Sequence, residues 1–427
     1  MRKFVLITVS LLLSICILFT SVSCTVNPIT PKYQDKDISV ENLLGKYSSR
    51  TDKSGIQVTQ DFKDALVQFS FDICKAVTKK DGNNVAMSPL SIYLCLAMIA
   101  NGADGDTKAQ MEDVLGMSIA DINKGLYALL NGFSSSENCK LDIANSVWFK
   151  DDNILKIQES YLQEIADWYE SEIYKAPFDK QTLEDVNNWS SNKTKGLIDK
   201  ILDYILDNDE AFILNAVLFD AKWRDEYTSK DILNNYKFNN IDKTTTTVTM
   251  LKSEEHVVFM GTDYIGTKKD YDGQKYSFVV LLPNEDVDFY EFVNFLDKEK
   301  WNEIMTVDKN PVTVSLLMPE FEVKTDMMLN PALQMLGIKD AFGNKANFGK
   351  MAEITPDCDL YLSRVIQRAY VKVDRVGTKA AASTIGAMTN KSASTPQTII
   401  VDRPYVYAII DNDTNCPIFV GLNVKFS

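Results

Sequence analysis

The sequence is poor in the residues and motifs that most enzymes need. It has one histidine, His256, which lies in the stretch SEEHVVFM without a partner motif. Ser-His-Asp, Cys-His and histidine-based zinc sites each need a placed imidazole. The sequence also has no GxxxxGK[ST], GxGxxG or GxSxG pattern. We therefore expect a protein that is not an enzyme and that uses no metal and no cofactor.

Paired cysteines and positive charge are also scarce. The seven cysteines show no CxxC spacing, so they indicate neither a zinc site nor a disulfide framework. Cys74 and Cys95 fall in apolar helical patterns that are typical of a core. Without Arg2 and Lys3, the chain has 43 basic and 59 acidic residues, a formal charge of −16. Such a charge disfavours nucleic acid and anionic lipid surfaces and favours a basic protein partner.

The N-terminus has the pattern of an export signal. Two basic residues precede an uncharged run over residues 4–20, and the small residues SVSC follow. We expect residues 1–24 to be a signal peptide of the lipoprotein type, with Cys24 as the lipid attachment site. Ser21 replaces the leucine usual in bacterial lipoproteins, so cleavage after Ser23 without lipidation is the alternative. Residues 25–58 are polar and aperiodic, which predicts a tether. The expected location is secreted or at the cell surface, with a lipid anchor as the only membrane contact.

The rest of the chain, residues 59–427, predicts one mixed α+β domain. Residues 62–77 have helical periodicity, and Ser88 and Pro89 begin a helix that is apolar all round and ends near Gly102. Thr107 and Gln110 predict a capping box for a further helix. Residues 157–174, 183–206 and 329–336 also indicate helix. Strands are predicted at 141–150, 211–223, 244–251, 257–260, 276–283, 312–318, 369–373, 398–401, 405–410 and 418–425. The pattern has neither a βαβ rhythm nor a repeat, which favours large, mainly antiparallel sheets.

A segment of small residues, GTKAAASTIGAMTNKSASTPQ, covers Gly377–Gln397. Its composition is typical of a flexible linker. A linker should separate domains, however, and only about thirty residues follow it, in strand-like runs. The segment is therefore predicted to be an exposed loop between strands of one domain.

Five motifs, in order, resemble the serpin family of serine protease inhibitors. They are NVAMSPLSI at 84–92, ILNAVLFDAKW at 213–223, LLMPEFEV with LQMLGIKDAF at 316–342, RAYVKVDRVGTKAAAST at 368–384, and DRPYVYAI with CPIFVGLNVKF near the end. The resemblance covers residues 59–427. It implies three β-sheets, eight or nine helices and an exposed reactive-centre loop, here 375–397.

The resemblance also implies an activity. A target protease cleaves the loop, is trapped as a covalent acyl-enzyme, and is carried along as the loop inserts into the main sheet. The implied partners are a trypsin-like serine protease or, as a cross-class alternative, a papain-like cysteine protease, and the protein is expected to be a monomer. A serpin that does not inhibit but binds or carries a ligand is a second hypothesis. A surface adhesin or enzyme that shares the fold is a third.

The loop residues fit an inserting strand. The implied hinge comprises Gly377, Thr378, Lys379, Ala380, Ala381, Ala382, Ser383 and Thr384. Alternate residues from Thr378 to Met388 carry no charge, and Lys379 falls on the opposite face, so insertion would bury no lysine on that face. The family's spacing from Gly377 places the cleaved bond between Lys391 and Ser392, which suits trypsin-like proteases. Counting back from DRPY favours Ala393 instead.

The resemblance further implies a cluster where the sheet opens. Ser88, Ser91 and Asn215 match its polar residues, and Trp223 matches an aromatic residue at the top of the sheet. Gln367 stands where the family commonly has histidine, and an amide can still donate and accept hydrogen bonds. Arg375 and Val376 replace the usual acidic pair before Gly377, so the family's ion pair at the base of the loop is not expected here.

Overall fold

The computed structural model describes residues 33–151, 155–306, 313–353, 360–378 and 397–426. These residues form nine α-helices, together with short 3-10 helices that include η1 (Leu43–Lys46). The helices are α1 (Gln60–Val77), α2 (Pro89–Gly102), α3 (Gly105–Leu115), α4 (Ile119–Gly132), α5 (Glu159–Trp168), α6 (Lys180–Lys193), α7 (Phe289–Phe295), α8 (Lys298–Met305) and α9 (Asn330–Leu336).

The strands form three sheets, named A, B and C here. Sheet A has the order β11 (Phe321–Met328), β12 (Arg364–Val373), β13 (Gly377–Thr378), β4 (Ala211–Lys222), β2 (Cys139–Lys150) and β3 (Glu172–Ala176). Sheet B has the order β1 (Val85–Met87), β16 (Pro417–Asn423), β15 (Tyr405–Asp411), β9 (Tyr276–Pro283), β8 (Tyr264–Asp270) and β7 (Val258–Met260). Sheet C has the order β14 (Gln397–Ile400), β10 (Val314–Pro319), β6 (Thr245–Glu255) and β5 (Ile232–Asn239).

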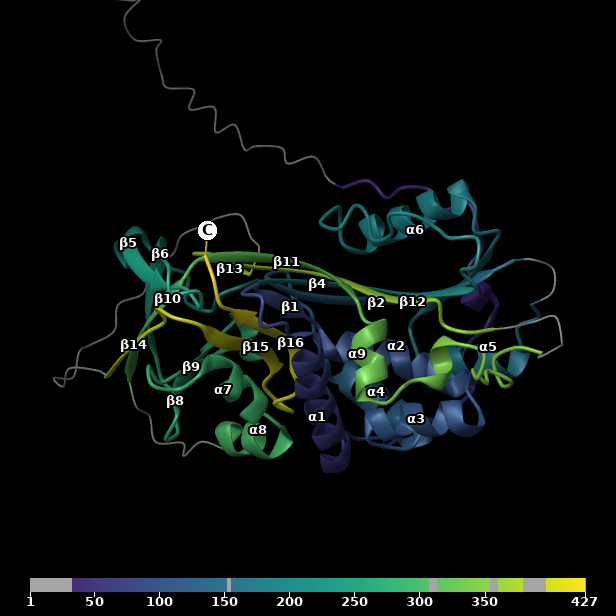
Figure 1. Ribbon diagram of the computed structural model, residues 1–427, viewed down its shortest axis with the longest axis horizontal. Helices are drawn as coiled ribbons and strands as arrows, with labels where there is room; N and C mark the ends of the chain where they lie inside the picture. Colours follow the sequence, from purple (N-terminus) through teal and green to yellow (C-terminus); the bar gives the residue numbers. More distant parts are fainter. Residues whose placement is uncertain (1–32, 152–154, 307–312, 354–359, 379–396, 427) are drawn as a thin grey trace, which may run out of the picture. The chain divides into compact units, whose positions relative to one another are not determined.

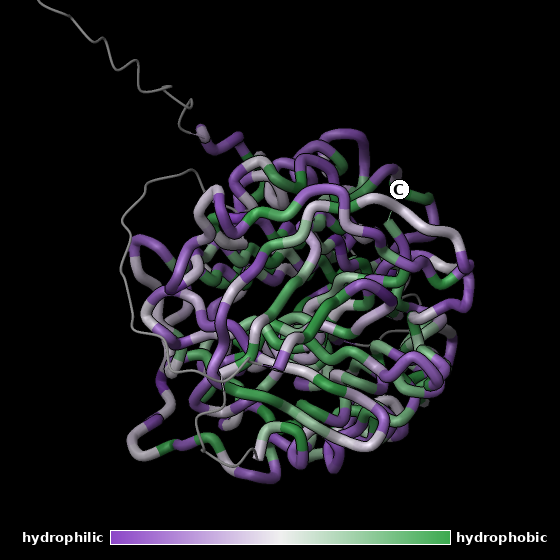
Figure 2. Tube along the Cα trace, turned by 90° about the vertical axis from the view of Figure 1, so that its left-hand side faces the viewer, coloured by the Kyte–Doolittle hydropathy of each residue, from purple (hydrophilic) through white to green (hydrophobic). Residues whose placement is uncertain are grey.

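Sheet A lies between two layers of helix (Figure 1). Helix α6 packs on one face of the sheet over β4, and α2 packs on the other face against β2 and β4. Because both faces are covered, β4 is apolar along most of its length, as predicted for residues 211–223. Hydrophobic stretches of the chain run through the interior, while hydrophilic ones occupy many of the outer turns (Figure 2).

Most predicted elements are confirmed, with differences where local patterns were ambiguous. Ser88 precedes α2 as expected, but its hydroxyl donates to the Ile418 carbonyl oxygen at 2.8 Å instead of capping the helix. The predicted capping box is wrong, because α3 begins earlier and the Gln110 side chain accepts backbone N–H groups from Lys339 and Asp340. The end of the predicted helix over 157–174 is strand β3, which pairs with β2.

Residues 35–58 are part of the compact unit that continues to the C-terminus, although their sequence predicts a tether. Leu44 is buried, and the Asn42 side chain accepts the backbone N–H of Ile173 in β3 at 3.1 Å. The Ser39 hydroxyl donates to Asp185 of α6 at 2.5 Å. The segment therefore packs beside β3, at the edge of sheet A. Among the described residues, every helix is too short or too polar to cross a lipid bilayer.

Candidate functional site

The first two residues of the predicted reactive loop are already a strand of sheet A. In β13, Gly377 pairs with Lys222 and Thr378 pairs with Ala221, both in β4. On the other side, Thr378 pairs with Val373 of β12. Gly377 and Thr378 were predicted to belong to an exposed loop, and that prediction is wrong for these two residues. The start of the hinge is seated between the two strands that an inserting loop would have to separate.

Below β13 the sheet is closed. Residues Arg364–Arg368 of β12 pair directly with Phe212–Ala216 of β4, as parallel strands. A further strand has no place between these two segments unless they separate. Strands β12 and β4 therefore form a seam that is open only at the end occupied by β13.

Gly377 is required by close packing of the backbone. A Cβ atom at this position would lie 2.0 Å from the Ala221 carbonyl oxygen and 2.6 Å from the Lys222 Cα. Both are backbone atoms of a paired strand, so they could not move aside without disturbing β4. Glycine therefore allows the hinge to enter the sheet at this level.

Thr378 points into the interior, where aromatic rings cover the top of the seam. Its hydroxyl hydrogen bonds with the Tyr271 hydroxyl at 2.7 Å. The Tyr271 ring stacks on Trp223, with ring centroids 4.5 Å apart and planes inclined by 8°. Burial raises the pKa of Tyr271 well above its usual value, which keeps the phenol neutral. Trp223, the aromatic residue expected at the top of the sheet, directly follows the last residue of β4.

A tight turn joins β12 to β13. One residue of this turn, Arg375, forms an ion pair that the sequence did not predict. The Asp374 carboxylate accepts the backbone N–H of Val376 at 2.9 Å and that of Gly377 at 3.3 Å. Arg375 Nε lies 3.4 Å from Glu320 Oε1, just before β11. The replacement of the family's acidic residues therefore leaves an ion pair at the base of the loop, in which the loop residue is the basic partner.

Four predicted residues of the sheet-opening cluster meet at the closed part of the seam. The Gln367 amide of β12 donates to Asn215 Oδ1 of β4 at 2.9 Å and to the Ser88 carbonyl oxygen at 3.0 Å. Its Oε1 atom accepts the Ser88 N–H at 3.1 Å. The Asn215 amide also donates to the Ser91 hydroxyl. Gln367 thus bonds across the two strands, and Trp223 lies apart from this group at the far end of β4.

The sequence did not identify two further members of this cluster. Asn145 of β2 accepts from the Asn215 amide at 2.6 Å, and the Cys95 thiol donates to the same Asn145 oxygen at 2.8 Å. Asn145 shares its strand face with Leu141 and Ile143. An asparagine on a strand face that is otherwise apolar was the sequence feature that could have identified Asn145 as part of a buried polar cluster. Cys95 is buried and free, as the helical pattern predicted, and burial raises the pKa of its thiol.

Other predicted site residues lie outside the described residues. They are Cys24, Lys379, Ala380, Ala381, Ala382, Ser383, Thr384, Lys391 and Ser392.

Comparisons with known proteins agree with this geometry. The family model described as "Serpin (serine protease inhibitor)" matches residues 64–425. Human serpin B8 is 29% identical over 84% of this chain and 98% of its own. The leukocyte elastase inhibitor of Sus scrofa is 28% identical over 84% of this chain and 97% of its own.

A solved structure of a thermophilic serpin, tengpin, is similar in two states. The native state is 36% identical, covers 91% of this chain and 100% of that chain, and has a TM-score of 0.85. The latent state is 34% identical, covers 87% and 99%, and has a TM-score of 0.76. On its sequence, its three sheets and the family match, the chain belongs to the serpin family.

Proposed function

We propose that this serpin is a suicide-type inhibitor of extracellular serine proteases with a trypsin-like preference. The observation that carries the proposal is β13, whose two residues occupy the open end of the seam while β12 and β4 remain paired below. A loop that begins as a short central strand can insert by continuing in the same direction, provided that β12 and β4 separate below it.

The register of β13 supports a specific inserted state. Antiparallel pairing means that each step forward along the loop is one step back along both β4 and β12. Continued from Thr378, the register would bring Thr384 level with Asn215 and with Gln367. Insertion would therefore break the hydrogen bond from the Gln367 amide to Asn215 Oδ1, and Thr384 carries a hydroxyl that could pair with both side chains.

The phase of the strand also suits insertion. Thr378 points inward, so Ala380, Ala382 and Thr384 would point inward too, since strand side chains alternate. These side chains are small and uncharged, which allows burial against the core without an unpaired charge.

The chemistry follows from cleavage of the bond after Lys391. The protease serine attacks the Lys391 carbonyl carbon, an ester bond forms, and the peptide bond to Ser392 breaks as its nitrogen leaves protonated. Because Thr378 is already in the sheet, insertion of the thirteen residues from Lys379 to Lys391 would carry the acylated protease about 43 Å, at roughly 3.3 Å per residue. The enzyme is trapped if insertion precedes attack by water on the ester. Cys24 would hold the inhibitor at a cell surface through a lipid, where it meets extracellular proteases.

Incubation with trypsin tests the proposal. We expect a complex that survives denaturing electrophoresis, and release of a C-terminal fragment whose mass identifies the cleaved bond. Lys391→Ala should abolish the complex with trypsin if the bond is Lys391–Ser392. A fragment beginning after Ala393 would shift the assignment to that bond, and the same incubation with papain tests the cysteine-protease alternative.

Cleavage of the loop without a stable complex would contradict the inhibitor proposal. The melting temperature before and after nicking then distinguishes the alternatives. A large rise indicates that the loop inserts but too slowly to trap trypsin. An unchanged melting temperature favours a serpin that binds or carries a ligand.

A further inference from the structure

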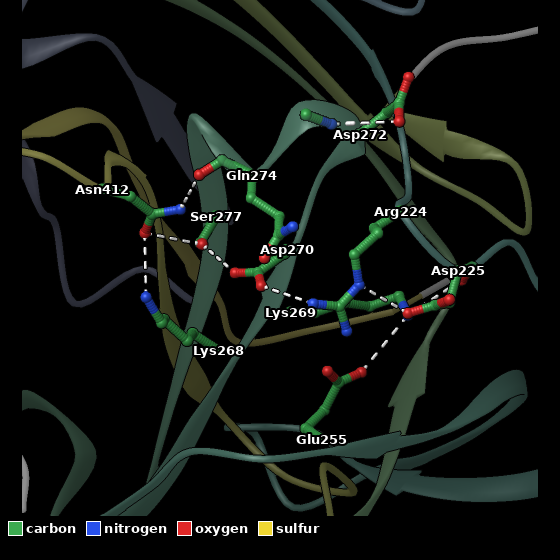
Figure 3. A network of polar contacts seen from close by, with 11 residues as sticks. Arg224, Asp225, Glu255, Lys268, Lys269, Asp270, Asp272, Gln274, Ser277 and Asn412 are labelled. Carbon is green, nitrogen blue, oxygen red and sulfur yellow. Dashed lines mark hydrogen bonds and ion pairs between the residues drawn. The ribbon is translucent and has the colours of Figure 1, made fainter. Parts of the chain in front are cut away.

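A buried lysine lies where the three sheets meet, close to the base of the loop. Lys269 is the penultimate residue of β8 in sheet B, and only 3% of its surface is exposed. Its ammonium lies 3.4 Å from Glu255, which ends β6 of sheet C and is equally buried. The same ammonium donates to the Asp225 carbonyl oxygen at 3.1 Å, in the segment that follows β4 of sheet A. Figure 3 shows Lys269 between Glu255 and Asp225.

Aromatic rings complete the surroundings of the ammonium. Lys269 Nζ lies 4.7 Å from the centroid of the Tyr227 ring and 5.4 Å from that of Trp223. The Glu255 carboxylate also accepts from the Ser253 hydroxyl at 2.6 Å. A cation in this position is attracted to both ring faces as well as to the carboxylate. Lys269 therefore fixes both aromatic ends of the segment 223–227, which we name the clamp segment.

The clamp segment holds the base of the reactive loop through its backbone. The Trp223 N–H donates to the Val376 carbonyl oxygen and the Tyr227 N–H donates to that of Arg375, each at 3.0 Å. The Trp223 indole N–H donates to the Asp374 carbonyl oxygen at 2.9 Å. All three acceptors lie in the turn that leads into β13, so the position of the clamp segment sets the position of the hinge.

A second contact ties the clamp segment to the same strand. The Arg224 N–H donates to the Asp270 carbonyl oxygen at 3.1 Å, and its guanidinium lies 3.0 Å from the Asp270 carboxylate (Figure 3). This ion pair is more exposed than the one at Lys269, and exposed pairs contribute little. Lys269 is therefore the buried attachment between β8 and the clamp segment, and the Arg224–Asp270 pair is the partly exposed one.

We propose that Lys269 is a positioning residue for loop insertion. By fixing the clamp segment, Lys269 keeps the end of β4 separated from β12, and this gap is as wide as the strand β13 that occupies it. This inference rests on the proposed function, because loop insertion is the step that it positions. A buried ion pair is commonly no more stabilising than apolar residues of similar volume, so stability alone does not account for a charge here. An ammonium can satisfy a carboxylate, a carbonyl and two rings at once, and an apolar side chain cannot.

The inference predicts that a change at Lys269 alters the fraction of cleaved inhibitor molecules that trap the protease, relative to those that are released as cleaved product. With the clamp segment loosened, β13 would leave the seam more often and insertion would begin later, while the exposed bond would still be cut. Lys269→Met should therefore raise the stoichiometry of inhibition of trypsin by roughly threefold or more, as loss of desolvated cation–π contacts would give. The rate of the first cleavage should be unchanged.

Lys275→Met is the matched control. Lys275 pairs with another buried carboxylate, Asp411, at 2.7 Å, but it directly precedes β9 of sheet B and makes no contact with the clamp segment among those the structure describes. We expect this variant to lose stability and to keep the wild-type stoichiometry. Equal effects of the two variants on stoichiometry would overturn the inference.

Two further measurements keep the test decisive. The double variant Lys269→Met/Glu255→Leu removes the charge that the single variant leaves unpaired, and should recover stability but not the stoichiometry. Recovery of both would overturn the inference, because Lys269 would then be only a partner for Glu255. Annealing of a synthetic peptide of residues 379–391, which would enter the seam below β13, needs no protease and is followed by the rise in melting temperature; it should be slower in Lys269→Met. If wild-type protein fails to trap trypsin, the proposed function fails while annealing still decides the role of Lys269. Equal annealing rates in the wild type and Lys269→Met, or a wild-type protein that binds no peptide, would overturn the inference about Lys269.

Discussion

The ion pair of Arg375 and Glu320 has a residue-scale consequence at the base of the loop. Arg375→Glu would place two carboxylates where the structure has opposite charges. Arg375 is about half exposed, with 53% of its side chain accessible against 24% for Glu320. Solvent screens such a pair, so we expect the free energy of unfolding to fall by only about 0.2–1 kcal/mol. The midpoint of urea unfolding measures this change.

The reversed pair is the control for this prediction. Arg375→Glu/Glu320→Arg restores opposite charges in the other orientation and should recover most of the lost stability. A double variant no more stable than the single one would show that the two side chains do not interact in solution.

Gly377 supports a second prediction at the same scale. Gly377→Ala would place a methyl group 2.0 Å from the Ala221 carbonyl oxygen, and so should expel β13 from sheet A. We expect a loss of about 1–3 kcal/mol of stability, typical of overpacking, with a higher stoichiometry of inhibition. Gly132→Ala is the control, because a Cβ there meets nothing within 4 Å. A Gly377→Ala variant that traps trypsin as efficiently as wild type would contradict the seating of the hinge.

At the scale of elements, the phase of β13 distinguishes neighbouring positions of the loop. In the continued register, Ala382 would lie level with Val217 and Ala369, facing inward, and Ala381 would lie level with Leu218 and Tyr370, on the other face. Ala382→Lys would bury an unpaired ammonium, which costs several kcal/mol. We expect this variant to be cleaved by trypsin as a plain substrate, without a stable complex on denaturing electrophoresis.

Ala381→Lys carries the same substitution one residue earlier. In the continued register its ammonium would lie on the same face as that of Lys379, so this variant should trap trypsin nearly as well as wild type. The opposite ranking of the two variants would show that the loop inserts in the other phase.

The elements differed in how well their sequences predicted them. Strand β4 was predictable because its continuous apolar run suits a strand covered on both faces. Ser88, Ser91 and Asn215 of the sheet-opening cluster were predictable because they lie in motifs that resemble a known family, and Gln367 directly precedes another such motif. Lys269 and Glu255 were not, because charges near strand ends usually face water and their burial depends on three sheets meeting. The sequence identified Arg375 as a basic residue just before the hinge. Its partner Glu320 is distant in the chain, and only the fold brings the two side chains together.

At the scale of the whole molecule, the boundary of the domain lies earlier than its sequence indicated. Residues 35–58 are polar and aperiodic, so composition alone favours a tether. Their attachment depends on a few anchors, among them Leu44 in the core, the Asn42 amide on β3 and the Arg50 N–H on Asp167 of α5. Short segments held by separate anchors lack the periodicity that identifies helices and strands.

A truncation tests whether this segment belongs to the folded unit. A chain that begins at Thr59 would expose the edge of β3 and the site of Leu44, and would remove the Ser39 contacts from the buried Asp185 of α6. Burial of one leucine is worth about 1.5–3 kcal/mol, so the free energy of unfolding should fall by at least about 2 kcal/mol. A chain that begins at Asp35 keeps all of these contacts and should match the full mature protein. Urea unfolding of the two truncated chains compares them directly, and equal midpoints would mean that residues 35–58 add nothing to the stability of sheet A.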